Sequence, residues 1–296
     1  MQTLEEIRAE RQVNQELTEI VDALKVIAVT EFWNLEERRR MRSKRFLDAF
    51  GGFFEMIDLS AAEHPFAQDT TGQMTLILVT SDERFMGGLN KRVVDTALEY
   101  PGADTAEIVV IGTQGSDYLK SLKRQHTVIS EVTTSQDQFE SALTLRDHVM
   151  EQGLRGEYGR LAIVYPRPVS FFVQAVETLP ILPCTELLAF ERKRMSDQES
   201  PLAKVEEVII ESNLHDLLEY MVRLWVTEKF LEVFEDSRQA ELSAKSVRLE
   251  ESHQTLQDNG KDLRHLFNRS RREKMDKGMR ETFTAQIMRR RVSFNV

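Results

Sequence analysis

The stretch VTSDERFMGGLN, residues 79–90, combines residue types that could hold a phosphate group. An apolar run precedes it, and Gly87 and Gly88 stand where a helix would begin. A strand, a glycine-bearing turn and a helix N-terminus form the usual phosphate cradle, because the free N–H groups of the first helical turn point at the anion. Such a cradle would predict a nucleotide enzyme, whereas the alternative is an ordinary corner of an α/β sheet.

The remaining residues of this stretch do not complete a nucleotide site. Dinucleotide sites need G-x-G-x-x-G and phosphate loops need G-x-x-x-x-G-K-[ST], because several backbone N–H groups must converge on the phosphates. Neither pattern occurs in the sequence, where IGTQG at 111–115 comes nearest. Asp82 and Glu83 would also repel an anion, so we expect no nucleotide and no other cofactor.

The histidines and the cysteine do not form a metal site or a nucleophilic site either. Six histidines are scattered through the chain without HExxH, HxH or Cys–His spacing. The single cysteine, Cys184, cannot form a disulfide within the chain, which fits a reducing cytoplasm. We therefore expect no catalytic residue and no metal ligand in this sequence.

The charged residues point instead to a partner with an acidic surface. The 296 residues carry a formal charge of −10, yet residues 261–296 hold eleven Lys or Arg against four Asp or Glu. An acidic body with a basic C-terminal segment favours binding to an acidic partner. Nucleic acid is not expected as that partner, because no aromatic stacking platform accompanies the basic residues.

Hydropathy gives no sign of a membrane segment. No apolar run reaches the roughly 18 to 20 residues that a membrane span needs. The N-terminal MQTLEEIRAE lacks both the basic start and the apolar centre of a signal peptide. We expect a soluble protein without direct membrane insertion.

Both ends of the chain are expected to form long helices. Residues 4–50 contain no Pro or Gly and place a stripe of apolar residues at three- and four-residue steps, namely Leu17, Ile20, Val21, Leu24, Ile27, Ala28 and Leu35. A second helical pattern runs from about Glu211 almost to the C-terminus, with stripes at Leu214, Leu217, Leu218, Met221, Leu224 and Trp225 and at Leu256, Asn259, Leu263, Leu266 and Phe267. Helices of this length need a partner, so we predict an antiparallel coiled coil in which Asn259 either sets the register or faces solvent.

The middle of the sequence has the pattern of an α/β domain. Apolar runs at 74–80, 106–112 and 160–166 alternate with amphipathic segments, which predicts a mainly parallel sheet with helices on its faces. Residues 168–183 are expected to add a strand that returns along the sheet edge. The predicted fold is α/β: a Rossmann-like domain at 73–205 inserted between coiled-coil helices at 1–55 and 206–296.

Blocks along nearly the whole sequence resemble the gamma subunit of F-type ATP synthases. VTSDERFMGGLN is similar to the family signature TSDRGLCGGLN, and IGTQGSDYLKS resembles its IGRKG strand and helix. Residues 7–28 resemble the N-terminal helix of the family at Ile7, Ile20, Ala23, Lys25 and Ala28. Two further blocks, SRQAELSAKSVRL at 237–249 and FNRSRRE at 267–273, resemble its SLASEHAARMxAM and YNRARQA segments.

The resemblance implies a rotor shaft without chemistry of its own. In that family the two long helices form an antiparallel coiled coil inside a ring of alternating alpha and beta subunits, and the beta subunits carry the ATP chemistry. The α/β domain docks on the membrane ring and on the epsilon subunit. These four partners and a peripheral position at the cytoplasmic face of the inner membrane are what the resemblance implies for this chain.

Resemblance and charge together suggest contact residues. Lys25 and Arg271 match basic positions of the family, whereas four others are inferred from charge alone: Arg272, Arg289, Arg290 and Arg291. We expect all six to meet acidic loops of the beta subunits, with solvated helix charges as the open alternative for the run 289–291. A docking turn is expected at Asp82, Gly87, Gly88 and Asn90.

Departures from the family pattern limit this comparison. Residues 83–86 read Glu-Arg-Phe-Met where the family has Arg-Gly-Leu-Cys, and Gly278 replaces a Glu. The C-terminal QIMRRRVSFNV lacks the small-residue ending of the family. These differences indicate a divergent branch, such as an alternative ion-pumping ATPase, and leave a non-rotary coiled-coil scaffold as the alternative function.

Overall fold

The structure is a computed structural model that describes residues 3–56, 73–84, 86–129, 132, 137–155, 158–186 and 214–292. Its side chains are described over the same ranges except at 43–56, 214–215, 218 and 288–292. The chain divides into two compact units, described separately below: a terminal unit of residues 1–27 and 247–296, and a central unit of residues 28–246. The elements, in chain order, are α1 (Leu4–Met56), β1 (Gln73–Val79), α2 (Leu89–Leu98), β2 (Glu107–Ile111), α3 (Thr113–Ser121), β3 (Thr127–Val128), α4 (Gln138–Leu154), β4 (Tyr158–Ser170), β5 (Val173–Leu182) and α6 (Leu214–Val292).

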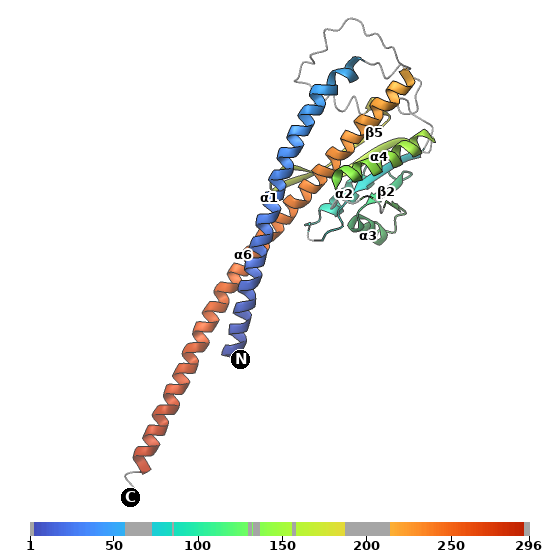
Figure 1. The fold of residues 1–296 in the computed structure, drawn as a ribbon. Coiled ribbons are helices and arrows are strands. Elements are labelled where there is room, and N and C mark those ends of the chain that lie inside the picture. Colours follow the sequence, from blue (N-terminus) through green and yellow to red (C-terminus); the bar gives the residue numbers. More distant parts are fainter. Residues whose placement is uncertain are drawn as a thin grey trace. The chain divides into compact units, whose positions relative to one another are not determined.

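The central unit contains a five-stranded sheet in the order β3-β2-β1-β4-β5. Figure 1 shows α2, α3 and α4 of the same unit around this sheet. The first four strands of this order pair in parallel, and Leu78 of β1 lies between Val110 of β2 and Val164 of β4. Strand β5 returns antiparallel to β4, with Val164 opposite Thr178. The predicted mainly parallel sheet with a returning edge strand is confirmed.

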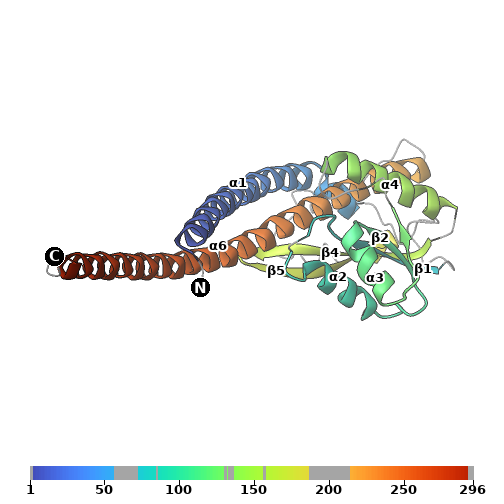
Figure 2. The same ribbon diagram turned by 90° about the horizontal axis from the view of Figure 1, so that it is seen from below.

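Alternating side chains of the strands build a core on each face of the sheet. Leu76 and Leu78 pack with α2 and α3, whereas Ile77 and Val79 pack with α4 and the first part of α6. Figure 2 shows α2 and α3 on one side of the sheet and α4 on the other. Because strand side chains alternate between faces, a continuous apolar run is what a strand covered on both sides requires.

The two long helices pair antiparallel within each unit. In the terminal unit, Asn14 of α1 contacts Leu256 of α6, and Lys25 contacts Glu250. In the central unit, Ala28, Phe32 and Leu35 of α1 cluster with Leu242 of α6. In both units residue numbers rise along one helix as they fall along the other, so the predicted antiparallel pairing is confirmed.

The predicted apolar stripe on the N-terminal helix is only partly correct. Leu17, Ile20, Leu24 and Ile27 are 42–55% exposed, whereas Ala28 and Leu35 are buried. Two paired helices cover only a narrow seam of each other's surface, so most of a broad stripe stays open to solvent. Of the residues predicted for the first C-terminal stripe, Met221 and Trp225 are buried in the core of the central unit.

The predicted domain limits cannot be compared directly with the structure. The expected boundary between residues 205 and 206 lies outside the described residues, and the expected boundary at residue 55 falls within α1. The division into domains therefore stays a prediction. Within the described ranges, no helix has a stretch long and apolar enough to cross a membrane.

Candidate interaction sites

The turn after β1 caps helix α3 with its own polar groups. The N–H of Thr113 donates to Asp82 Oδ1 at 2.8 Å, and the N–H of Gly115 donates to Thr80 Oγ1 at 3.1 Å. Between them, the N–H of Gln114 donates to the carbonyl oxygen of Ser81. The N–H groups that would cradle a phosphate at this helix are thus engaged by the chain itself, and the carboxylate of Asp82 takes the place of an anion.

The glycines around this turn allow the chain to pass close to itself. A Cβ at Gly112 would overlap the carbonyl of Thr80, and one at Gly115 would overlap the Thr80 side chain. Gly87 and Gly88 have φ values of 60° and 84°, which side chains disfavour. The Gly-Gly pair therefore supplies the left-handed backbone that leads into α2.

The same turn is fastened to α6 within the central unit. The carboxylate of Glu83 accepts from Lys245 Nζ at 2.8 Å and from Arg238 Nη1 at 3.3 Å. The hydrogen bond from Lys245 lowers the pKa of Glu83 below its ordinary value. Buried Met86 packs with Leu89 and with two alanines of α6, Ala240 and Ala244. A residue that departs from the family signature, Glu83, is therefore a structural link of this chain.

The structure places the four predicted docking residues in one corner. Asp82 and Asn90 both accept hydrogen bonds from the chain's own backbone, the latter from the N–H of Ser81 at 3.0 Å. Gly87 and Gly88 are exposed beside them. Their local role is structural, and their role in docking a partner stays a proposal.

The structure does not bring the predicted basic contact residues together. Lys25 lies 2.7 Å from Glu250, whose hydrogen bond raises the pKa of Lys25. Arg271 and Arg272 are exposed on α6, about 20 residues or roughly 30 Å further along the helix from Glu250. The backbone of residues 289–291 lies in α6, but their side chains fall outside the described ones.

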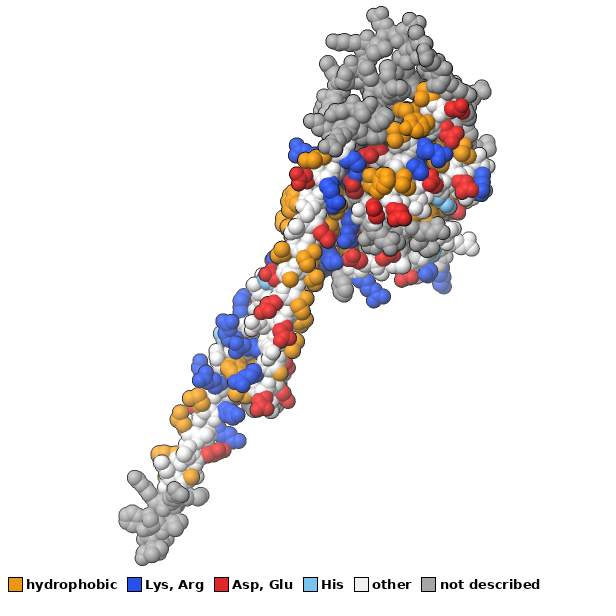
Figure 3. Space-filling model, in the orientation of Figure 1, with side chains coloured by type: hydrophobic (Ala, Val, Ile, Leu, Met, Phe, Trp, Pro, Cys, Tyr) orange, Lys and Arg blue, Asp and Glu red, His pale blue; other side chains and the backbone are white. Residues whose placement is uncertain are grey.

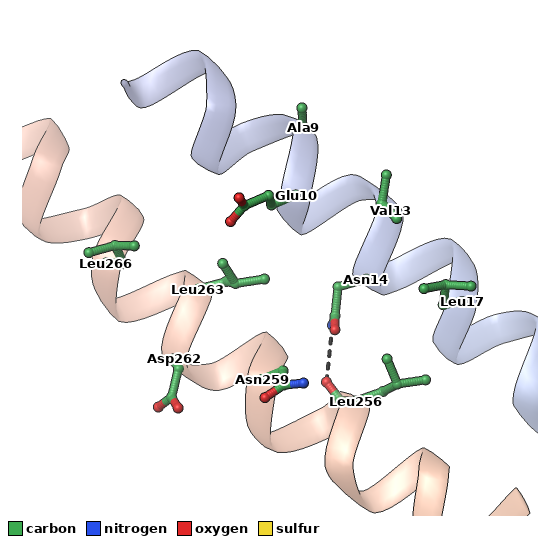
Figure 4. A pocket seen from close by; sticks show the side chains of 10 residues that line it. All are labelled: Ala9, Glu10, Val13, Asn14, Leu17, Leu256, Asn259, Asp262, Leu263 and Leu266. Atoms are coloured by element: carbon green, nitrogen blue, oxygen red, sulfur yellow. Dashed lines mark hydrogen bonds between the residues drawn. The ribbon is translucent and has the colours of Figure 1, made fainter. Parts of the chain in front are cut away.

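An apolar groove lies between the helices of the terminal unit. It has a volume of about 820 Å³ and is lined mainly by aliphatic side chains, including Val13, Leu17, Leu256, Leu263 and Leu266. Figure 4 shows Leu256 and Leu263 pointing toward α1 and the amide of Asn14 bonded to the backbone of α6. That bond, from Asn14 Nδ2 to the carbonyl oxygen of Leu256, measures 3.0 Å.

The polar residue that links the two helices here is one that sequence reasoning missed. Asn259, the residue proposed either to set the register or to face solvent, is exposed at the groove. Asn14 makes the interhelical bond instead, and its signal was a polar residue within the helical pattern one turn before Leu17. Short polar groups at such seams favour one alignment over others.

A second feature missed from the sequence is an apolar stripe near the end of α6. Met275, Met279, Phe283 and Ile287 recur every four residues, and all four are 46–67% exposed. Their spacing places them along one side of the helix. Figure 3 shows apolar and charged side chains interspersed along the terminal unit. Exposed stripes of this kind are typical of surfaces that other proteins cover.

The site geometry and the fold define a class of protein. It is an α/β protein in which a mainly parallel sheet stands, in chain order, between two long helices that pair antiparallel. The family described as ATP synthase matches residues 3–284. The chain belongs to that family, among its gamma subunits, the central-stalk subunits of F-type ATP synthases.

Individual relatives agree with this assignment. The chain is similar to the ATP synthase gamma chain of Nitratidesulfovibrio vulgaris, with 24% identity over 283 residues, covering 92% of this chain and 93% of the relative. The gamma chain of Clostridium beijerinckii is 26% identical over 201 residues, covering 66% and 65%. The predicted family resemblance is confirmed.

Solved structures show the same fold. A chain of the Euglena gracilis mitochondrial ATP synthase, from a structure with OSCP, F1 and c-ring, matches with a TM-score of 0.60 and 14% identity, covering 96% of this chain and 93% of that one. A chain from the central stalk and c-ring structure of the Tetrahymena thermophila enzyme matches with a TM-score of 0.54 and 18% identity, covering 79% and 99%. The unusual layout of a sheet domain between two long helices is thus shared.

Proposed function

We propose that the chain is a rotor shaft, which couples ion flow through a membrane ring to ATP synthesis or hydrolysis on the beta subunits of a catalytic ring. The observation that carries this proposal is the 79-residue helix α6 paired antiparallel with α1 in a chain of the gamma family. A shaft needs length, stiffness and a surface that other subunits can grip. It needs no active site of its own.

The proposed partners are the alpha and beta subunits, the epsilon subunit and the membrane ring. Family membership supports them, as do the solved relatives, whose structures include F1 and a c-ring. The exposed apolar stripe at 275–287 supports a covering partner for the end of α6. We place the chain peripherally in this complex, at the cytoplasmic face of the inner membrane.

Co-expression with the alpha and beta subunits of the same organism tests the function directly. The expected result is a complex with one copy of this chain per ring, whose ATP hydrolysis exceeds that of the ring alone. Failure to assemble would reject the rotor in favour of the non-rotary scaffold. Assembly without any change in hydrolysis would also contradict a rotor that drives the beta subunits.

The basic segment of α6 is proposed to contact acidic loops of the beta subunits. Arg271 and Arg272 are exposed there, as a contact with another chain requires. Reversing both charges, with Arg271→Glu and Arg272→Glu, should lower coupled turnover severalfold without loss of assembly, because attraction becomes repulsion. Turnover is measured as ATP-driven ion pumping per ATP hydrolysed.

A matched control distinguishes the effect of a specific contact from the effect of the change in net charge. Lys274→Glu with Lys277→Glu changes the net charge equally on the same exposed stretch of helix. We expect a smaller effect from the lysine pair. Equal losses in both variants would mean that no specific contact at Arg271 and Arg272 exists.

A further inference from the structure

We propose that two arginines of α1 and a set of carboxylates on α6 form a register lock, which holds the two helices of the central unit in a single antiparallel alignment. The lock consists of Arg39 and Arg42 on α1 with Glu228, Glu235 and Asp236 on α6. This inference goes beyond the proposed function. A helix register is a property of this chain alone, whether or not the chain turns inside a ring.

The contacts of the lock are charged and partly buried. Arg39 Nη1 donates to Asp236 Oδ1, and Asp236 is only 1% exposed. A carboxylate withdrawn from water needs a cation beside it, and Arg39 supplies one. Arg42 donates to Glu235 through Nη1 and to Glu228 through Nε, the latter at 3.0 Å. Its guanidinium therefore joins two carboxylates that lie about two helical turns apart.

Among the side chains that the structure describes, apolar contact between the two helices of the central unit is confined to a small cluster. The apolar residues of α6 from 222 to 234 pack in the core with the sheet and α4. Up to residue 42 of α1, where its described side chains end, the apolar cluster that joins α1 to α6 uses one residue of α6, Leu242. Apolar contact has no directional preference. The charged pairs therefore distinguish one register from its neighbours.

A slip of one helical turn moves α1 by four residues, about 6 Å along α6. In one direction Arg39 would leave Asp236 and face Ala240, which offers it no charge. The carboxylate of Asp236 would remain buried without that arginine. Because moving a cation away from a buried carboxylate is disfavoured, this slip is opposed by the lock.

The opposite slip is disfavoured for a different reason. Arg39 would then face Glu232 and keep a carboxylate beside it. Glu36, however, now accepts a hydrogen bond from Gln239 Nε2 at 2.7 Å, and one turn earlier on α6 it would face Glu235. Two carboxylates would meet in a partly buried place, where like charges repel more than they do in water. Both neighbouring registers are thus opposed by named residues.

Cysteine cross-linking in the full chain tests the lock by reporting the register itself. Leu35→Cys with Leu242→Cys joins residues that cluster in the present alignment, and Leu35→Cys with Ser246→Cys joins residues that would meet only after α1 has slipped by one turn. Natural Cys184 is buried and does not compete. With the lock intact, the first pair should cross-link roughly tenfold faster than the second or more.

Neutralising the lock should remove this preference. In a chain that also carries Arg39→Gln and Arg42→Gln, we expect the ratio of the two cross-linking rates to fall several-fold. The reason is that the two cysteines of the offset pair would then meet more often. Arg38→Gln with Arg40→Gln is the matched control, since these two arginines are exposed neighbours on the same helix. The control should keep the original ratio. An unchanged ratio in the Arg39 and Arg42 variant, with helicity intact by circular dichroism, would overturn the proposal.

A second variant keeps the test decisive if the glutamine variant does not fold. Arg39→Lys with Arg42→Lys retains both charges but loses the fork that joins Glu228 to Glu235. An intermediate ratio is expected. A ratio equal to that of the control variant would show that the forked contacts do not set the register.

Discussion

At the scale of single residues, the close approach of the β2–α3 connection to the end of β1 depends on the lack of a side chain at Gly112. Gly112→Ala should lower the free energy of unfolding by about 3 kcal/mol or more, because the new methyl group would overlap the Thr80 carbonyl. Gly88→Ala is the comparison, since its φ of 84° is similarly disfavoured but no atom lies within 4 Å of the added carbon. It should cost about 1 to 2 kcal/mol. Urea unfolding measures both, and equal costs would argue against close packing.

Glu83 gives the chain a pH dependence of predictable sign. Since Lys245 holds the pKa of Glu83 below its ordinary value, the folded state binds this proton less readily than the unfolded state does. The stabilisation is therefore complete above the ordinary pKa of 4.5 and is lost as pH falls through the lower, folded-state pKa. Urea midpoints of the wild type and Glu83→Gln should differ at pH 7 and converge below pH 4.5. A gap that widened in acid would contradict this linkage.

At the scale of helices and strands, the terminal unit should open more readily than the central one. Its helices join through contacts such as Asn14–Leu256 and Lys25–Glu250, and Leu17, Leu24 and Leu266 are 41–45% exposed. Few buried apolar contacts mean a low free energy of local opening. Hydrogen exchange should therefore be faster in residues 3–27 and 247–287 than in β1 and β4. Equal protection in both units would refute this.

Sequence patterns predicted the positions of the helices and strands better than they predicted the contacts between them. The buried strands β1, β2 and β4 could be predicted because short apolar runs rich in β-branched residues are typical of buried strands. Strand β3 has only two residues, which is too short for such a run. Helix burial could not be read from spacing, because an apolar stripe does not say how much of it a partner will cover. Asn14 and the pairs of Arg39 and Arg42 depend on residues about 200 positions away, which no local pattern encodes.

At the scale of the whole molecule, Cys184 is a natural reporter of unfolding. It is the single cysteine of the chain, it is buried, and burial raises the pKa of its thiol to about 12. At pH 8 the folded chain should react with a thiol reagent roughly a thousandfold more slowly than the chain in urea. Rapid labelling of a chain shown to be folded would mean that the core around Cys184 opens locally.

The resemblance to the gamma subunits could be recognised from the sequence because the matching blocks occur in the family's order across most of the chain. The signature residues also have local structural roles: Asp82 caps α3, and Glu83 ties the turn to α6. A signature match alone therefore does not separate a docking surface from a structural joint.

The pairing of α1 with α6 also fixes an order of events during synthesis. Arg39 meets Asp236 across a separation of 197 residues. A ribosome adds about 5 to 20 residues per second, so the first helix waits roughly 10 to 40 s before its partner has been made. During that interval its apolar residues Phe32 and Leu35 lack the neighbour that later buries them. The nascent N-terminal helix therefore presents these apolar side chains to other proteins and to chaperones until α6 has been made.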